Sequence, residues 1–285
     1  MRHSQLKAFH DVALHGGFSR AADMIHQAQP ALSEHVRRLE QGYDVLLFHR
    51  DRKQVRLTET GERLFVLTKR MFEVEAQISE YLTESRAALD GRLRIIVDSA
   101  HHITAALRRF QTRHPQVFVS MRTGNSEEIL TALRTYDAEI GVVGSVDPGR
   151  EFETLDLGQT PIIAIAAQGF LPDPPRPMTL KEIARLPLVF REPESRTRQK
   201  LEEEAARQNL RLTPAIEVEG REAMREVVAS GTGIGFVSEA EFGHDARFVK
   251  VPLKDAPMAM RETLVYLAQR RDLRLIRAFM DHATG

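Results

Sequence analysis

Hydrophobic residues near the start of the chain recur three and four positions apart, the spacing of helices that bury one face. The first such set predicts a helix from Gln5 to His15 that Gly16-Gly17 ends, and it comprises Leu6, Phe9, Val12 and Ala13. Ser19 is the expected N-cap of a short second helix, whose apolar positions are Ala21, Ala22, Met24 and Ile25.

Gln29-Pro30 opens a third predicted helix, because proline suits a first helical turn. Its buried face is expected to contain Leu32, Val36 and Leu39. Its exposed positions are polar: Ser33, Glu34, Arg37 and Arg38. Two short helices before a third, polar-faced helix are typical of a helix-turn-helix.

A wing is predicted after the third helix. Two short apolar segments, Leu46-Leu47-Phe48 and Val55-Arg56-Leu57, bracket the charged run His49-Arg50-Asp51-Arg52-Lys53. Strands on either side of a basic turn have this pattern.

A long helix is then predicted from Thr58, its N-cap, to about Leu89. Its apolar residues are separated by 3, 4, 3, 4 and 3 positions: Leu64, Leu67, Met71, Val74, Ile78 and Tyr81. This heptad spacing favours a seam between two chains. An ordinary amphipathic helix packed on its own domain has similar spacing, and that alternative stays open.

From residue 91 the pattern alternates short apolar runs with helical stretches, which predicts an α/β body with mostly parallel strands. The predicted strands are Leu93 to Val97, Val117 to Met121, Ile140 to Val143, Ile162 to Ala166, Leu188 to Phe190, Ile216 to Val218, Ile234 to Val237 and Thr263 to Leu267. The predicted helices lie near residues 103–114, 126–135, 196–208 and 221–230.

Composition adds limits to this picture. A chain of 285 residues exceeds the usual size of one hydrophobic core, so two folding units are expected. Zero net charge hides an asymmetry: residues 1–70 hold 12 Lys and Arg against 8 Asp and Glu, which leaves 28 against 32 elsewhere. A basic head is typical of a nucleic-acid reader. Without cysteines, a membrane-length apolar run or a signal-like start, we expect a cytoplasmic protein with no membrane partner.

Five motifs in one register resemble the LysR-type regulators: Gly17-Phe18-Ser19-Arg20-Ala21-Ala22, Gln29-Pro30-Ala31-Leu32-Ser33, Leu39-Glu40, Leu47-Phe48-His49-Arg50 and Leu57-Thr58-Glu59-Thr60-Gly61. The resemblance implies an α/β protein with an N-terminal all-α winged helix-turn-helix, a long linker helix, and a two-lobed effector domain like the periplasmic binding proteins. It also implies a dimer that assembles into a tetramer. The expected domains are 1–58, 59–90 and 91–285, with lobe I at about 91–160 and 265–285 and lobe II at about 161–264.

Two residues depart from the family pattern. Ala28 replaces the usual serine, which removes a polar group near DNA, and Asp44 replaces the usual glycine, although aspartate tolerates a left-handed turn. Other segments resemble the LysR-type subgroup associated with aminoethylphosphonate catabolism: Asp98-Ser99, Gly124-Asn125-Ser126, Arg191-Glu192-Pro193, Gly220-Arg221-Glu222-Ala223 and Val237 to Gly243.

The expected partner of the N-terminal domain is double-stranded operator DNA. Base edges need hydrogen-bonding groups and phosphates need cations. The candidate DNA-binding residues are Gln29, Pro30, Ser33, Arg37 and Arg38 on the third helix, and Arg50, Arg52 and Lys53 on the wing. A phosphate or solvent role for Arg38 remains an alternative.

A small anionic effector is expected in the C-terminal domain, because ligands gather at the carboxyl ends of parallel strands and helix starts bind oxyanions. The candidate effector residues are Ser99, His101, His102, Asn125, Ser126, Arg191, Ser195, Arg196, Thr197 and Glu219. A carboxylate would hold an amine on the same ligand, and Asp98, Glu192, Glu219 and Glu239 are candidates for it. 2-Aminoethylphosphonate is the proposed ligand, with another small organic anion as the alternative.

Other chemistries lack their motifs. Gly231-Thr232-Gly233-Ile234-Gly235 leads from a helix into a strand, the reverse of a dinucleotide loop, so we expect a turn and no cofactor. The eleven histidines lack metalloprotease spacing, and adjacent His101 and His102 should point apart, so no metal site is expected. An enzyme built on a two-lobed domain is the rival class, but the N-terminal third favours a regulator.

Overall fold

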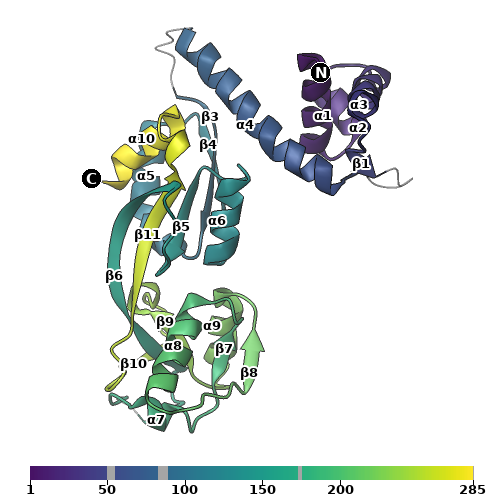
Figure 1. Cartoon of the computed structure of the whole chain (residues 1–285). Coiled ribbons are helices and arrows are strands. Elements are labelled where there is room, and N and C mark those ends of the chain that lie inside the picture. The colour runs from purple at the N-terminus through teal and green to yellow at the C-terminus, as the bar shows by residue number, and fades with distance from the viewer. Residues whose placement is uncertain (50–54, 83–88, 173–174, 285) are drawn as a thin grey trace. The chain divides into compact units, whose positions relative to one another are not determined.

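The computed structural model describes residues 1–49, 55–82, 89–172 and 175–284. The chain forms two compact units, Met1–Ala87 and Ala88–Gly285, each considered by itself (Figure 1).

The N-terminal unit begins with three helices: α1 (His3–His15), α2 (Phe18–Met24) and α3 (Gln29–Tyr43). The helical periodicity is confirmed, because the predicted apolar residues of α1 and α3 share one core. Gly16 ends α1 in the left-handed conformation at φ 65°.

The helix ends differ from expectation at one residue and agree at another. The N-cap of α2 is Gly17, so the prediction of Ser19 as N-cap is wrong, and Ser19 lies in the first turn. Asp44 follows α3 at φ 52°, which confirms the predicted left-handed turn. Ala28 is the N-cap of α3 and supplies no side-chain hydrogen bond there.

A two-stranded ribbon follows α3, with β1 (Phe48–His49) antiparallel to β2 (Arg56–Leu57). The strands are shorter than predicted, and Leu46 is exposed rather than paired. The candidate wing residues Arg50, Arg52 and Lys53 lie outside the described residues.

The long helix α4 (Glu59–Leu82) begins where predicted, because Thr58 Oγ1 accepts a hydrogen bond from Gly61 N at 3.0 Å. A Cβ on Gly61 would lie 2.2 Å from the Leu47 carbonyl oxygen, so only glycine lets α4 start against the ribbon. The predicted continuation to Leu89 passes through residues 83–88, outside the described part.

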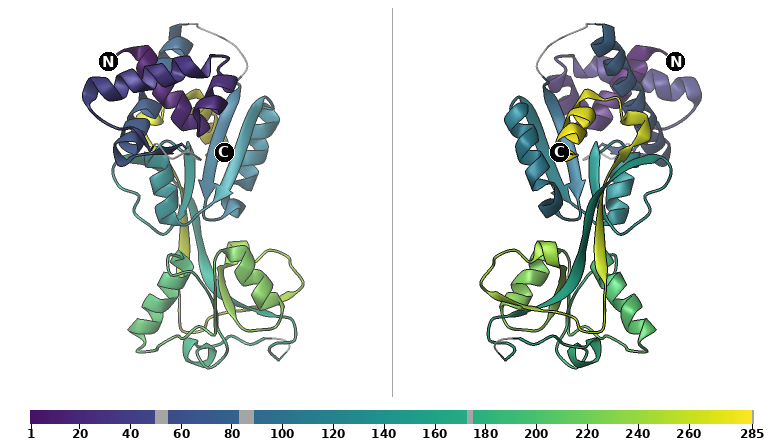
Figure 2. Two further views of the ribbon diagram at one scale, coloured as in Figure 1. Left: turned by 90° about the vertical axis from the view of Figure 1, so that its right-hand side faces the viewer. Right: turned by 90° about the vertical axis from the view of Figure 1, so that its left-hand side faces the viewer.

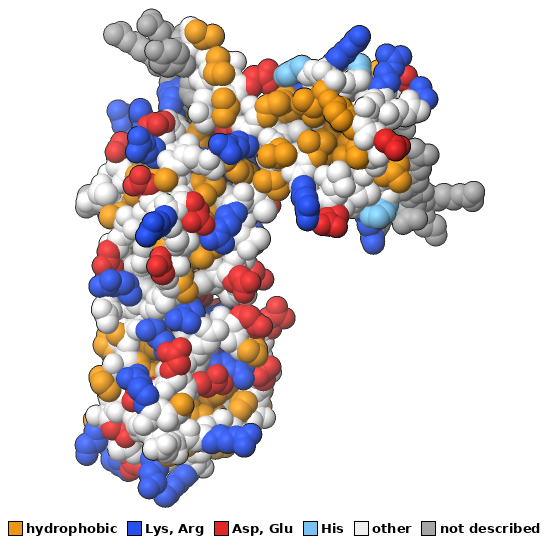
Figure 3. Space-filling model, viewed as in Figure 1, with side chains coloured by type: hydrophobic (Ala, Val, Ile, Leu, Met, Phe, Trp, Pro, Cys, Tyr) orange, Lys and Arg blue, Asp and Glu red, His pale blue; other side chains and the backbone are white. Residues whose placement is uncertain are grey.

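Some of the heptad residues of α4 are packed against the core of the unit, and others are exposed to solvent. Leu64 and Met71 pack against the helix-turn-helix core. Leu67, Val74 and Ile78 are 62%, 46% and 55% exposed. Hydrophobic side chains gather over the N-terminal unit in the space-filling view (Figure 3). The side chain of Tyr81, the last member of the predicted seam, is not among those described.

Lobe I of the C-terminal unit contains the strands β3 (Gly91–Val97), β4 (Val117–Thr123) and β5 (Ile140–Gly144), with helices α5 (Thr104–Arg113), α6 (Ser126–Arg134) and α10 (Arg274–Ala283). β3 lies between β4 and β5 and is parallel to both. The core of this lobe joins Leu93, Ile95 and Val97 to Phe110 and Phe279.

Two long strands connect lobe I to lobe II, and Figure 2 shows them running side by side. β6 (Phe152–Ala167) pairs antiparallel with β11 (Ala259–Leu267) through its first part, up to Pro161. Its second part, from Ile162, pairs antiparallel with β9 (Gly235–Ser238) and β10 (Phe248–Val251). The described strands of the sheet follow the order β10-β6-β11-β5-β3-β4, with β9 paired to β6.

Lobe II surrounds the second part of β6 with a separate core that includes Leu180, Phe190, Leu201 and Phe236. Its remaining elements are α7 (Leu180–Ile183), β7 (Val189–Arg191), α8 (Arg196–Arg207), β8 (Ile216–Val218) and α9 (Arg221–Ala229). β7 and β8 form a parallel pair. The described part of this unit also contains three short 3-10 turns: η1 (Ala100–Ile103), η2 (Glu239–Glu241) and η3 (Ala268–Arg270).

The prediction of mostly parallel strands is wrong, because the sheet is mixed: β11, β9 and β10 are antiparallel to their neighbours. The two-lobed α/β architecture is confirmed, and the four predicted helices match α5, α6, α8 and α9 within a few residues. Gly231 to Gly235 forms the predicted turn, where a Cβ on Gly233 would lie 2.5 Å from the Pro187 carbonyl oxygen. No helix among the described residues is both long enough and apolar enough to cross a membrane.

Candidate DNA-binding face and effector site

A polar stripe runs along α3 opposite its buried face. Gln29, Ser33 and Arg37 are four residues apart and all exposed, so they share one side of the helix. Pro30 and Arg38 are exposed beside this stripe. A face of this kind offers an amide, a hydroxyl and guanidinium donors for the groups along a DNA groove.

Glu34 holds both arginines of this face. Arg37 Nε donates to Glu34 Oε2 at 2.8 Å, and Arg38 Nε donates to Glu34 Oε1 at 2.6 Å. These hydrogen bonds, from Arg38 first and then Arg37, lower the pKa of the Glu34 carboxyl. The arginines are thereby oriented along the helix surface without DNA.

Glu40 connects α3 to the ribbon. Its Oε1 accepts hydrogen bonds from Leu47 N at 2.8 Å and Phe48 N at 3.4 Å, which fixes where β1 begins. Sequence reasoning noted Leu39-Glu40 only as a motif and missed this role. A glutamate eight residues before a strand carries no local signal for it.

The strands of both lobes end at one junction. Asp98 follows β3 in lobe I, and Arg191 ends β7 in lobe II, with Arg191 Nη1 3.6 Å from Asp98 Oδ1. Arg221, at the start of α9, donates to the Asp98 carbonyl at 2.9 Å and to Asp98 Oδ1 at 3.2 Å. The lobes therefore meet through ion pairs at their strand ends.

Further charges extend this network. Arg221 Nη2 lies 2.9 Å from Glu241 Oε1, and Arg191 Nη2 donates to Glu192 Oε1 at 2.5 Å. Glu192 Oε2 also accepts from Gly220 N at 2.9 Å. Asp98 and Glu192 thus hold arginines, whereas the predictions treated them as candidates for a ligand amine.

The helix starts beside this network carry buried donors without a protein partner. Ser126 Oγ at the start of α6, and Ser195 Oγ and Arg196 Nε at the start of α8, make no hydrogen bond among the described residues. Arg196 Nη2 donates to the Ser145 carbonyl at 3.0 Å, which ties the start of α8 to the segment after β5. Buried donors normally have a partner, so these groups are suited to a bound anion.

The other predicted effector residues differ in burial and in their hydrogen-bond partners. Ser99 and Thr197 are buried near the same strand ends and helix starts. Asn125 Oδ1 caps α6 by accepting from Glu128 N at 3.0 Å, so its oxygen has a structural role. Arg191 is already paired to carboxylates, and Glu219 is exposed with its side chain outside the network.

The rings of His101 and His102 form a T-shaped contact, with centroids 5.5 Å apart and planes at 84°, so the prediction that these side chains point apart is wrong. His101 is exposed, whereas the His102 side chain is 8% exposed and its Nε2 lies 3.7 Å from Glu262 Oε1. Burial, and then the neighbouring His101 and Arg221 charges, lower the pKa of His102 to about 4. Burial, and then the Asp98 and Glu241 charges, raise the pKa of Glu262 to about 8.

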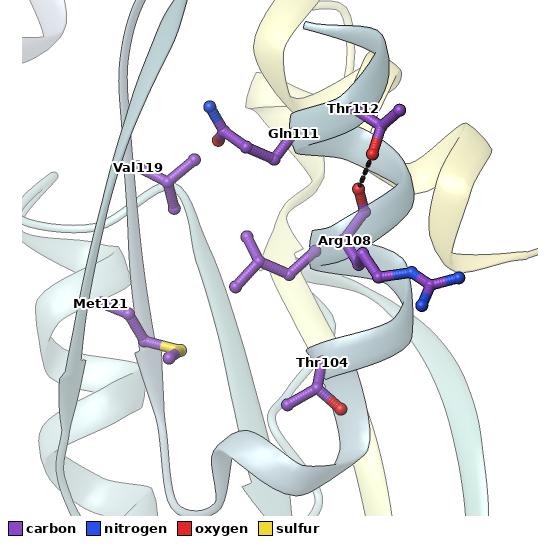
Figure 4. Close-up of a pocket in the computed structure, with 7 residues that line it drawn as sticks. Thr104, Arg108, Gln111, Thr112, Val119 and Met121 are labelled. Atoms are coloured by element: carbon purple, nitrogen blue, oxygen red, sulfur yellow. Dashed lines mark hydrogen bonds between the residues drawn. The ribbon is translucent and has the colours of Figure 1, made fainter. Parts of the chain in front are cut away.

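A separate hollow lies between α5 and β4 on lobe I. Figure 4 shows Val119 and Met121 of β4 facing α5, from which Gln111 points back toward the strand. β4 is the last strand in the sheet order, and Phe118, on the face of β4 opposite Val119, is 56% exposed. This edge combines apolar surface with unpaired backbone, which is the composition of an interaction surface.

Two family models match the chain. Residues 3–62 match the bacterial regulatory helix-turn-helix protein, lysR family, and residues 86–285 match the LysR substrate binding domain. The RuBisCO operon transcriptional regulator of Allochromatium vinosum is 30% identical over 277 residues, covering 94% of this chain and 90% of the relative.

Solved structures share the fold. Full-length OxyR from Pseudomonas aeruginosa has a TM-score of 0.78 at 19% identity, covering 99% of this chain and 94% of that one. Full-length CbnR in complex with its target DNA has a TM-score of 0.70 at 18% identity, covering 100% and 99%. Both matched domains are those of regulators, so the protein is not an enzyme. The chain belongs to the LysR family of DNA-binding transcriptional regulators, with an N-terminal helix-turn-helix and a two-lobed effector-binding domain.

Proposed function

We propose that a small anion bound at the junction of the two lobes controls how this regulator binds its operator. The observation that carries the proposal is the set of buried donors without a protein partner at the starts of α6 and α8: Ser126 Oγ, Ser195 Oγ and Arg196 Nε. A helix start adds free backbone N–H groups and a partial positive charge to such donors. The protein acts in the cytoplasm, where bacterial operator DNA lies.

The ligand class follows from these donors, and two candidates for its identity remain. 2-Aminoethylphosphonate offers a tetrahedral oxyanion to the hydroxyls and an amine to a carboxylate. The A. vinosum relative is named for the RuBisCO operon, which favours testing other small organic anions beside it. Phosphonate use therefore rests on the sequence resemblance of the lobe segments alone.

We propose that the DNA-reading groups of α3 are Gln29, Pro30, Ser33, Arg37 and Arg38, with Arg50, Arg52 and Lys53 on the wing. The exposed stripe on α3 supports the first set. The DNA complex of CbnR, which shares the fold, supports operator binding as the use of this domain.

We propose a homodimer whose seam includes Leu64, Leu67, Met71, Val74 and Ile78, and a tetramer built from two dimers. The exposed apolar residues of α4 support the seam. The edge of β4 and the hollow beside α5 are a second apolar surface of the kind a tetramer needs. A second copy of the chain is the occupant we assign to it.

A titration tests the effector proposal. The full chain is mixed with 2-aminoethylphosphonate, phosphate, small carboxylates and a neutral amine while thermal unfolding is followed. A bound anion at a hundredfold its Kd should add about 2.7 kcal/mol of stability. Ser195→Ala and Ser126→Ala should weaken that response, whereas Ser120→Ala on β4 serves as a matched control.

The outcomes separate the parts of the proposal. If only the phosphonate fails, its identity is wrong and the anion site stands. If no anion stabilises the chain, or if the serine variants respond like the control, the anion site itself is wrong.

A further inference from the structure

Three buried side chains converge where the lobes meet, and they come from three separate parts of the chain. His102 lies in η1 of lobe I, Glu262 lies on the connecting strand β11, and Glu241 lies in η2 of lobe II. One ligand atom from each lies within 4.8 Å of the others. Their side chains are 8%, 2% and 5% exposed, so water does not readily solvate them.

Two of these groups have no hydrogen-bond partner among the described residues. His102 Nε2 and Glu262 Oε2 are both fully shielded and unpaired. The two side chains are neighbours, since His102 Nε2 is 3.7 Å from Glu262 Oε1. Leaving buried polar atoms unpaired is costly, and a ligand between them would remove the cost.

We propose that His102, Glu241 and Glu262 form a binding site for a divalent transition-metal ion, which fixes lobe I, lobe II and the connecting strand relative to one another. One imidazole nitrogen and two carboxylates suit Zn²⁺, Co²⁺, Ni²⁺ or Mn²⁺, whereas Ca²⁺ and Mg²⁺ prefer oxygen ligands alone. Ligand atoms about 3.4 Å apart surround such an ion at tetrahedral geometry, so the side chains need to move inward only slightly.

The surrounding charges accommodate a dication. Arg191 and Arg221 contribute two positive charges, and Asp98, Glu192 and Glu241 contribute three negative charges. With Glu262 ionised on binding, the cluster carries a net charge of −2, which one divalent ion neutralises. Arg221 holds Glu241 at 2.9 Å and so orients one ligand from outside the site.

The site differs from the anion site, because it uses none of the unpaired donors at the starts of α6 and α8. The sequence positions of the three ligands also explain why the sequence analysis did not predict a metal site. The ligands are 139 and 21 residues apart in sequence, so no local pattern contains them.

Cobalt is the direct probe of this site. The full chain, freed of metal with a chelator, is titrated with Co²⁺ while visible absorption and calorimetry are recorded. We expect one ion per chain, visible bands typical of a protein-bound Co²⁺, displacement by Zn²⁺, and a rise in the unfolding temperature with Zn²⁺.

Variants assign the ion to its ligands. Glu262→Gln and Glu241→Gln, which keep the side-chain shape, should each weaken Co²⁺ binding by about tenfold or more. His101→Ala, which removes the exposed neighbouring imidazole, should leave it unchanged. Glu262→Gln should still respond to the anion that binds the parent, which distinguishes this site from the effector proposal.

Two results would overturn the inference. One is a parent chain that binds no Co²⁺ or Zn²⁺ in the titration. The other is a pair of folded glutamine variants that bind Co²⁺ as tightly as the parent, which would assign the ion to surface histidines.

Discussion

At the scale of single residues, the α3 surface contains residues that can contact DNA and a glutamate that orients one of them. Arg37 is exposed on the same side as Gln29 and Ser33, while Glu34 orients it. The guanidinium can leave Glu34 for a base edge, because an exposed ion pair contributes little stability.

We expect Arg37→Ala to weaken operator binding by about 1–3 kcal/mol and to blur sequence preference, because a base contact is lost. Arg52→Ala, on the predicted wing, should weaken operator and random DNA about equally. Binding titrations with both DNAs check this. Uniform loss at Arg37 with selective loss at Arg52 would reverse the two assignments.

His10 gives the N-terminal unit a pH dependence. Burial, and then the charge of Lys7, lower the pKa of His10 to about 4, and its Nδ1 lies 3.0 Å from Thr68 Oγ1 on α4. Thr68 Oγ1 donates to the Phe65 carbonyl, so the His10 nitrogen acts as the donor to Thr68.

A depressed histidine pKa means that the unfolded chain takes up a proton first as the pH falls. The free energy of unfolding should therefore drop between about pH 6.5 and pH 4, by up to about 3 kcal/mol from this group. Denaturant unfolding of the full chain measured across this range tests it. His10→Gln should flatten the dependence relative to the exposed control His49→Gln, and an unchanged slope would refute it.

At the scale of elements, α4 has one set of apolar residues packed on its own unit and another set exposed. Leu64 and Met71 pack on the helix-turn-helix core, whereas Leu67, Val74 and Ile78 remain exposed. Packing on the chain's own domain is thus observed for one set of heptad positions, and the seam between two chains stays a prediction for the other set. One set of heptad positions anchors the helix, and the other remains available for a second chain.

We expect Leu67→Glu combined with Val74→Glu to split the dimer and to weaken binding to a full operator, because charges replace apolar burial. The fold of the unit should persist, since both side chains are already exposed. Sedimentation and circular dichroism measure the two effects. Arg70→Glu, an exposed change on the same helix, is the control, and a double variant that stays dimeric would favour packing on the chain's own domain alone.

At the scale of the whole molecule, effector control requires the lobes to have a preferred arrangement. Arg221 joins lobe II to Asp98 of lobe I through a backbone carbonyl and a carboxylate. A ligand shifts such an equilibrium only as far as it binds one arrangement better than the other.

We expect the effector and the operator to change each other's affinity by the same factor, as linkage requires. Arg221→Gln should bring that factor closer to one, because the Arg221–Asp98 contact between the lobes is lost. Arg247→Gln is the matched control, since Arg247 pairs with Glu226 and Asp245 inside lobe II. Equal factors in the parent and both variants would show that this contact does not carry the coupling.

Features that depend on nearby residues could be predicted before the fold was known. The periodicity of α1 and α3, the helix stop at Gly16, the left-handed turn at Asp44 and the cap at Thr58 follow from local backbone and side-chain chemistry. Four helices of the effector domain, α5, α6, α8 and α9, followed from the same reasoning. The α3 stripe could also be predicted, because four-residue spacing fixes one face of a helix.

Features that depend on partners far away in the sequence became visible in the folded chain alone. The direction of β11 beside β5 and β6 comes from chain topology, so an apolar run could not reveal that the sheet is mixed. Asp98, Arg191 and Arg221 pair across the two lobes. His102 and Glu262 meet although 160 residues separate them. Charge pairing and burial act through space, and for these residues the fold alone brings the groups within reach.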